Sequence, residues 1–180
     1  RAFVWRFELD AGARPLSTTL TRAIVRSRQQ WTYEDAQTAI DRGDAPESLL
    51  AMPWFGAQRD ERESERGGAS LDMPEISIVR VGDEYTLQLD EAVPLEHHNA
   101  HVSLLTGMAA AEIMLRGGIG ILRTMPPAAD ADVASFRERA HALGLPWAAD
   151  VAYGDYLRTL PRTPAARAVR EAAASLFRGA

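Results

Sequence analysis

The sequence contains neither cysteine nor lysine. Without cysteine, the chain can form no disulfide and no thiolate metal site. Without lysine, all 20 positively charged side chains are arginines, each with a planar guanidinium group that suits phosphate. Arginine-only usage is often a feature of a GC-rich genome, so it does not by itself indicate an anionic ligand.

Long hydrophobic runs and an excess of positive charge are also absent. No stretch approaches the roughly 20 consecutive apolar residues that a membrane span needs. The first residues, RAFVWRFELD, lack signal-peptide anatomy because Arg6 and Glu8 interrupt their short apolar run. We therefore expect no membrane partner and a cytoplasmic location. The net charge of −5 argues against a general nucleic-acid-binding domain, which would usually be basic.

The 180 residues, 46% of them hydrophobic, can form one domain with a core of normal size. Apolar and charged residues alternate over residues 3–9, which is the period of a half-buried strand, and a second strand over residues 16–27 would complete a hairpin. The segments ISIVR and EYTLQL predict another hairpin around Gly82. The segment GIGILRTM, residues 118–125, is typical of a buried strand.

Helices are expected over residues 32–41, from residue 46 to 66 with a bend at Pro53, and over residues 97–116, 130–143, 153–160 and 164–177. Thr32 can cap the first of them and Gly43 can end it. Alternating charges, with Arg59 and Glu63 four residues apart, predict a solvated face on the second helix. Strands followed by helices without regular alternation indicate an α+β fold with mixed or antiparallel strands and a helical C-terminal half.

Histidines gather where the helix over residues 97–116 begins. His97 and His101 share one face with a set of apolar residues at three- and four-residue steps, namely Leu104, Met108, Ala111 and Leu115. Together with Glu96 and His98 they could bind a metal. Histidines at the start of a buried helix more often form hydrogen bonds without binding a metal, and no HExxH motif is present. We therefore expect that no metal is bound here.

Other candidate residues have ordinary structural explanations when each is taken alone. Tyr33 shares a helix face with Ala36 and Ile40, where a core tyrosine is commoner than a ligand contact. Arg26 and Arg28 would usually be solvated. No nucleophile elbow, P-loop or GxGxxG motif is present, and no close cluster of aspartates could hold two magnesium ions. These residues by themselves predict only a soluble α+β domain.

Four segments, taken in order, suggest more. The first, RAIVRSRQQWTYEDAQ, contains a strand-to-helix joint that ends in a tyrosine, and the second, GGASLDMPEISI, contains a Gly-Ala…Pro-Glu hairpin. The third, EHHNAHVSLLTGMAAAEIML, is helical, and the fourth, GIGILRTMPP, contains a Leu-Arg…Pro strand end. Their order and spacing resemble the catalytic RNB domain of the ribonuclease II family, which are hydrolytic 3′-to-5′ exoribonucleases. The resemblance extends over nearly the whole chain and implies that residues 1–180 are a middle segment of such a domain.

This resemblance implies a segment of an exoribonuclease that degrades single-stranded RNA, with a role in the channel wall and in contacts to the terminal nucleotide. The family's magnesium-binding aspartates lie upstream of the matched region, and its Ser-Pro-Ile-Arg-Arg-Tyr segment, with a catalytic arginine, lies downstream. We expect Mg²⁺ to be bound by aspartates outside this segment, no catalytic residue within it, and no activity of the isolated chain.

Two alternatives remain open. The first is a catalytically silent RNB-like module that binds RNA or a protein partner. The second is a small metal-binding enzyme that uses Glu96, His97 and His101. The sequence does not indicate an oligomeric state.

The resemblance also implies which residues contact RNA: Tyr33, Arg26, Arg28, Asn99 and His101. Tyr33 matches the family tyrosine that lies beside the last nucleotides. Where the family has paired glutamates, one of which contacts the ribose, this chain has His101 and Val102. Where the family often has a phenylalanine that stacks on the terminal base, this chain has Leu71. His101 or Asn99 could replace the glutamate as a hydrogen-bonding partner of the ribose, with the two arginines near the phosphates.

Overall fold

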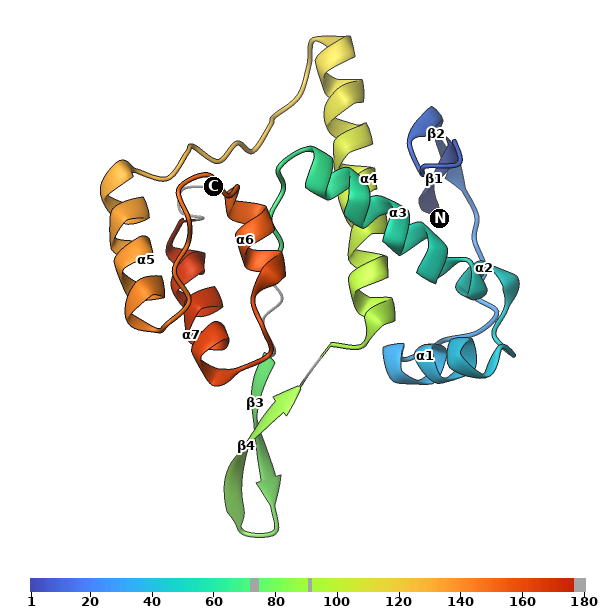
Figure 1. Ribbon diagram of the computed structural model, residues 1–180. Helices are drawn as coiled ribbons and strands as arrows, with labels where there is room; N and C mark the ends of the chain where they lie inside the picture. The colour runs from blue at the N-terminus through green and yellow to red at the C-terminus, as the bar shows by residue number, and fades with distance from the viewer. Residues whose placement is uncertain (72–74, 91, 177–180) are drawn as a thin grey trace. The chain divides into compact units, whose positions relative to one another are not determined.

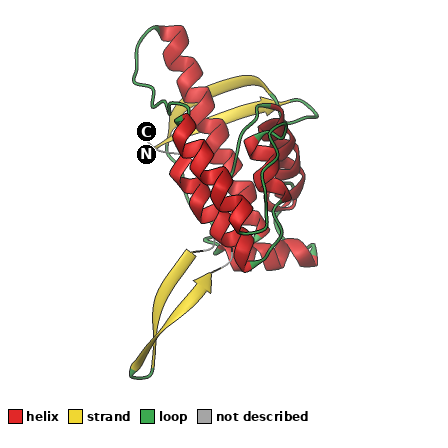
Figure 2. Ribbon diagram, turned by 60° about the vertical axis from the view of Figure 1, so that its left-hand side comes forward, coloured by secondary structure: helices red, strands yellow, loops and turns green. Residues whose placement is uncertain are grey.

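The structure, a computed structural model, describes residues 1–71, 75–90 and 92–176. The described strands are confined to two antiparallel hairpins, and helices make up most of the rest (Figures 1 and 2). The strands are β1 (Ala2–Leu9), β2 (Pro15–Ala23), β3 (Glu75–Val81) and β4 (Glu84–Asp90). The helices are α1 (Tyr33–Arg42), α2 (Glu47–Leu50), α3 (Met52–Glu65), α4 (Pro94–Gly117), α5 (Asp130–Ala142), α6 (Tyr153–Thr159), α7 (Pro164–Ala173) and a 3-10 turn (Ala174–Leu176). The predicted α+β class is confirmed.

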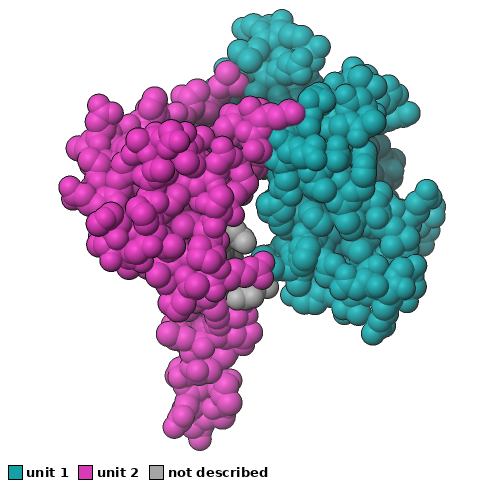
Figure 3. Space-filling model, viewed as in Figure 1, with its two compact units in different colours: residues 1–62, 92–121 teal, residues 63–91, 122–180 magenta. Residues whose placement is uncertain are grey.

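The chain forms two compact units, each built from two separate stretches of sequence (Figure 3). Unit 1 contains residues 1–62 and 92–121, and unit 2 contains residues 63–91 and 122–180. The chain passes between the units three times, so neither unit is a continuous piece of sequence. This explains why no linker could be recognised in the composition of the chain.

In unit 1, β1 and β2 form the predicted hairpin, with Trp5 opposite Leu20. The turn between them is fixed by Asp10, whose Oδ1 accepts hydrogen bonds of 2.8 Å from the backbone N–H groups of both Gly12 and Arg14. The hydrogen bond from Arg14 and a second from Gly12 outweigh desolvation and lower the pKa of Asp10. A short polar side chain that binds its own backbone in this way is a common means of closing a turn.

A buried arginine anchors this turn to α3. Arg59 is only 3% exposed, and its Nη1 donates a 3.1 Å hydrogen bond to the carbonyl of Ala13, a fully buried residue with a φ of 53°. Glu63, one turn further along α3, is 9% exposed. The predicted solvated face of this helix is therefore wrong at these two positions. Charge alternation indicates helical spacing, but it does not indicate which charged groups are buried, and Arg59 is buried where it meets the hairpin turn.

The ends of the longer helices in unit 1 follow local sequence signals. The Thr32 side chain accepts a 3.1 Å hydrogen bond from the backbone N–H of Asp35 and so caps α1, as predicted. Gly43 ends α1 and Gly118 ends α4, both with positive φ, where glycine avoids a steric penalty. Helix α4 begins at Pro94, three residues before the expected start, and proline is well suited to the first helical position. A break at Ala51 separates α2 from α3, just ahead of Pro53.

The buried face of α4 differs from the predicted one. The buried residues are Leu95, His101, Leu105 and Ala109, whereas Leu104 is 47% exposed and Leu115 is 66% exposed. This helix is apolar on nearly every side. Hydrophobic periodicity predicts the buried face of a helix only when polar residues occupy the opposite face. It therefore could not predict which face of α4 is buried.

Two predicted strand segments are not strands. Strand β2 ends at Ala23, and Ile24 is 87% exposed. The segment over residues 118–125, expected as a buried strand, has no regular secondary structure, and its Ile121 is 88% exposed. A strand needs a neighbouring strand with which to form backbone hydrogen bonds, and within the described residues neither segment has one.

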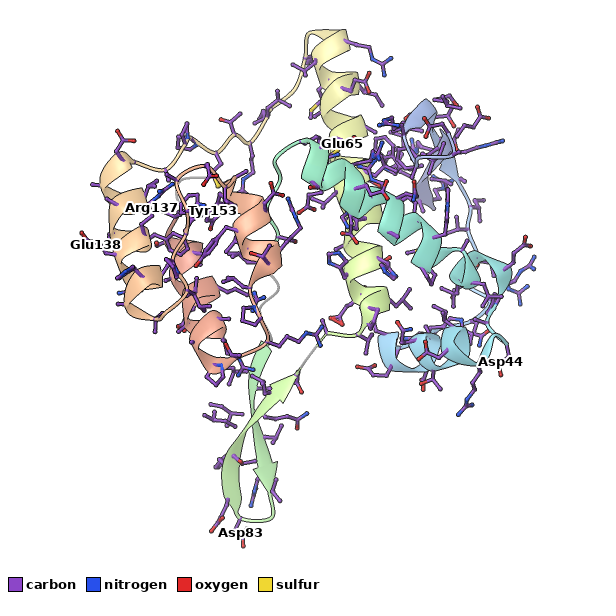
Figure 4. All side chains as sticks on the ribbon, in the orientation of Figure 1. Asp44, Glu65, Asp83, Arg137, Glu138 and Tyr153 are labelled. Carbon is purple, nitrogen blue, oxygen red and sulfur yellow. The ribbon has the colours of Figure 1, made fainter. Side chains whose placement is uncertain are left out.

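The core of unit 2 is helical. Helices α5, α6 and α7 enclose a cluster of buried residues, among them Phe136 and Val169, with Leu71 packed against it. Aromatic rings pack edge to face around Phe136, and the guanidinium of Arg137 lies 4.2 Å from the centre of the Trp147 ring. Figure 4 shows the side chains of Arg137 and Tyr153 in this unit. The chain before Leu71 is joined to α6 through Arg158, whose Nη1 donates a 3.0 Å hydrogen bond to the carbonyl of Gly68.

The second hairpin also belongs to unit 2. Strands β3 and β4 pair as predicted, with Ile78 opposite Leu87 and Asp83 in the turn (Figure 4). Ile78 is 70% exposed and Leu87 is 71% exposed. The Pro74 of the Gly-Ala…Pro-Glu segment and the expected helix end at Phe177 lie outside the described residues. Among the described residues, every helix is too short or too polar to cross a membrane.

Candidate functional site

Two of the five residues predicted to contact RNA lie together in unit 1. Tyr33 is the first residue of α1, where the Thr32 cap positions it, and the side-chain amide of Asn99 on α4 donates a 2.8 Å hydrogen bond to its hydroxyl. A second bond ties the same two helices, because the Gln37 side chain accepts a 2.8 Å hydrogen bond from the backbone N–H of Leu95. Tyr33 is 40% exposed. The pair is thus fixed between two helices but remains accessible.

The two arginines lie in the loop that connects β2 to α1. Arg26, Ser27 and Arg28 line a shallow, open depression, and all three are exposed. Because β2 ends before this loop, the alternation of a strand does not decide which of the two arginines faces a ligand. Both guanidinium groups are available to an anion at this surface.

His101, the fifth predicted residue, is placed differently. It is 2% exposed, and its Nε2 lies 2.8 Å from Oδ1 of Asp60 on α3. The same carboxylate oxygen lies 2.7 Å from Nε2 of His97, one turn earlier on α4. A direct contact between His101 and ribose stays a prediction, and in this structure the buried imidazole contacts the half-exposed Asp60.

The carboxylate and the imidazoles affect one another. Partial burial opposes ionisation of Asp60, but hydrogen bonds from His97 and His101 outweigh it and hold its pKa below the usual range. Burial lowers the pKa of His98, and His97 lowers it further, so the neutral imidazole is favoured. The His98 ring packs directly over Gly56 of α3, in the space that a Cβ atom at Gly56 would occupy.

Asp60 was not recognised in the sequence. It lies between charged residues on a helix that was expected to face solvent, and it is 37 residues before His97. The only signal in the sequence for a site here was the four-residue spacing of His97 and His101. A third metal ligand would then have to come from a neighbouring helix. Glu96, the carboxylate considered from the sequence, does not belong to this group; among the described residues, the potential metal ligands that lie close together are Asp60, His97 and His101.

Comparison with known proteins identifies the fold. No protein-family model and no curated protein sequence matches the chain. Solved structures of Mycoplasma genitalium RNase R do match it. The complex with ribose-methylated single-stranded RNA and the apo form each give a TM-score of 0.82 over 98% of this chain, at 13% sequence identity. The complex with double-stranded RNA gives a TM-score of 0.80 at 14% identity. The chain has the fold of part of this RNase R.

The match is a partial one for the larger protein. This chain spans 30% of the RNase R chain in the first two structures and 34% in the third. At 13–14% identity the likeness shows the fold and does not transfer individual residues. Leu71, the position at which a stacking phenylalanine was expected, packs against the helical core of unit 2.

Proposed function

We propose that this chain is a segment of a 3′-to-5′ exoribonuclease that hydrolyses single-stranded RNA. The observation that carries the proposal is the RNase R fold over 98% of the chain, and the four sequence segments that resemble the RNB domain support it. The segment forms part of the channel wall and contacts the terminal nucleotides.

The Tyr33–Asn99 pair is the proposed ribose contact. A tyrosine hydroxyl can donate one hydrogen bond while it accepts others. Because Asn99 donates to this oxygen, the O–H of Tyr33 remains available to donate to a 2′-hydroxyl, the group that distinguishes RNA from DNA. Arg26 and Arg28, in the loop just before α1, would bind phosphates. His101 stays a proposed ribose contact, and its imidazole also forms a hydrogen bond with Asp60 of α3, which helps to set the position of α4.

The catalytic magnesium ions belong elsewhere in the protein. Magnesium prefers an octahedral set of oxygen ligands, and the group found among the described residues, Asp60 with two imidazoles, does not fit it. Aspartates outside this segment would hold two Mg²⁺ ions, which in such enzymes activate water and stabilise the leaving oxygen. No catalytic residue is assigned within the segment.

The isolated chain should therefore not degrade RNA, whereas the intact protein should. Each is incubated with a 3′-overhang RNA and magnesium, and the release of mononucleotides is measured. Release by residues 1–180 alone would show that the chemistry lies within this segment. If the intact protein binds the RNA without degrading it, the alternative applies, namely a catalytically silent RNB-like module that binds RNA or a protein partner.

A further inference from the structure

A second site lies on the opposite side of α4 from Asn99. His97 and His101 are one helical turn apart, so their side chains project from the same face of α4 toward α3. Asp60 of α3 meets both of them. The described part of the chain thus brings two imidazole nitrogens and one carboxylate oxygen together from two helices, with all three atoms within 4.8 Å of one another.

The spacing of these atoms suits a metal ion. Bonds from zinc to imidazole nitrogen and carboxylate oxygen are about 2.0–2.2 Å long, so two ligands on one tetrahedral ion stand about 3.3–3.6 Å apart. Oδ1 of Asp60 lies 2.7 Å from Nε2 of His97 and 2.8 Å from Nε2 of His101. Each oxygen-to-nitrogen distance would have to lengthen by about 0.5–0.9 Å to admit an ion.

The site is closed on one side and open on the other. The His101 side chain is 2% exposed, whereas those of His97 and Asp60 are 42% and 47% exposed. An ion could therefore enter from solvent past His97 and Asp60, and the buried His101 would fix its depth. Three protein ligands leave at least one coordination position open for water, unlike the four-ligand closed structural sites.

The donor set selects the class of ion. Two imidazoles and one carboxylate suit zinc, cobalt and nickel, whereas magnesium and calcium prefer sites made of oxygen alone. The chain has no cysteine, so thiolate-dependent ions are not favoured.

We propose that Asp60, His97 and His101 form an exchangeable binding site for a divalent transition-metal ion of the zinc class. This replaces the expectation, formed without Asp60, that the histidines bind no metal. Folding should need no ion here, because Leu105 and Ala109 of α4 are buried without one. The proposal does not depend on the proposed ribonuclease function.

The competing explanation is a purely hydrogen-bonded group. In that arrangement each histidine donates its Nε2–H to Asp60, which accepts both hydrogen bonds. Binding an ion requires each imidazole to present the Nε2 lone pair and to carry its proton on Nδ1. The two explanations predict different responses to added metal.

The test is a titration of the protein with Zn²⁺ and Co²⁺ after removal of metal by a chelator and desalting. Excess Mg²⁺ is kept present so that sites made of oxygen ligands are occupied. We expect one ion per chain by calorimetry, visible d–d absorption from bound Co²⁺, and shifts of the His97 and His101 imidazole NMR signals on addition of Zn²⁺.

Two variants probe the ligands, and a third is the control. His97→Ala and Asp60→Asn alter half-exposed side chains, so both variants should fold, and each should weaken Zn²⁺ binding at least tenfold. His141→Ala removes an exposed histidine of α5 outside the group and should bind Zn²⁺ like the parent. Circular dichroism confirms folding. No saturable Zn²⁺ binding by the parent, or unchanged binding by folded His97→Ala and Asp60→Asn, would overturn the proposal in favour of the hydrogen-bonded group.

Discussion

The sharpest test of the ribose contact is the substitution Tyr33→Phe. It removes one hydroxyl, nearly preserves side-chain volume and leaves α1 and its Thr32 cap in place. The Asn99 amide loses its acceptor, but Tyr33 is 40% exposed, so water can take over that hydrogen bond. The free energy of unfolding should therefore change by less than about 0.5 kcal/mol, the usual range for surface substitutions.

The effect on substrate choice should be larger. A hydrogen bond between uncharged groups contributes about 0.5–1.5 kcal/mol. Since about 1.4 kcal/mol corresponds to a tenfold change in rate, the loss of a bond from Tyr33 to the 2′-hydroxyl should lower the preference for RNA over DNA about two- to tenfold. In the intact protein, the assay is the ratio of cleavage rates on RNA and DNA ends of the same sequence.

Asn99 provides an internal check. If Asn99 acts by positioning the Tyr33 hydroxyl, then Asn99→Ala should lower the same ratio, and the double variant should lose no more than Tyr33→Phe alone. Tyr85→Phe is the matched control, since Tyr85 is a 73% exposed tyrosine of β4 in unit 2. A clear loss of stability in Tyr33→Phe with an unchanged ratio would mean that Tyr33 is a structural tyrosine and that the reasoning is wrong.

Three further substitutions test the packing of the units, two of them in unit 1 and one in unit 2. Gly56→Ala should reduce the free energy of unfolding by about 1–3 kcal/mol in urea denaturation, because the new methyl group displaces the His98 ring. Gly107→Ala on α4, where no atom lies close to the new methyl group, should instead raise the free energy of unfolding by about 0.5–1 kcal/mol. Equal effects at the two glycines would contradict the packing of His98 over Gly56. In unit 2, burial raises the pKa of Tyr153 to about 12, so its contribution to stability is complete below about pH 10 and is lost as the pH rises toward 12. Tyr153→Phe should show a shallower alkaline loss of stability than the parent, and parallel curves would show that Tyr153 does not titrate in this way.

The sequence by itself determined the features that depend on neighbouring residues. The Thr32 cap, the glycine that ends α1 and the two hairpins were predicted correctly. In each case the decisive interaction joins residues a few positions apart, so the unfolded chain already contains the preference. The α+β class was also readable from the order of the segments, and the match to the fold of part of RNase R extends over 98% of this chain.

The tertiary structure alone decided which surfaces meet. Arg59 is buried because the β1–β2 turn presents the Ala13 carbonyl to it. The face of α4 that packs could not be selected from a helix that is apolar on nearly every side. Asp60 reaches His97 and His101 only when α3 lies against α4, 37 residues away along the chain. Local preferences follow from short-range sterics and hydrogen bonding, whereas burial and the assembly of a site depend on partners that only the folded chain brings together.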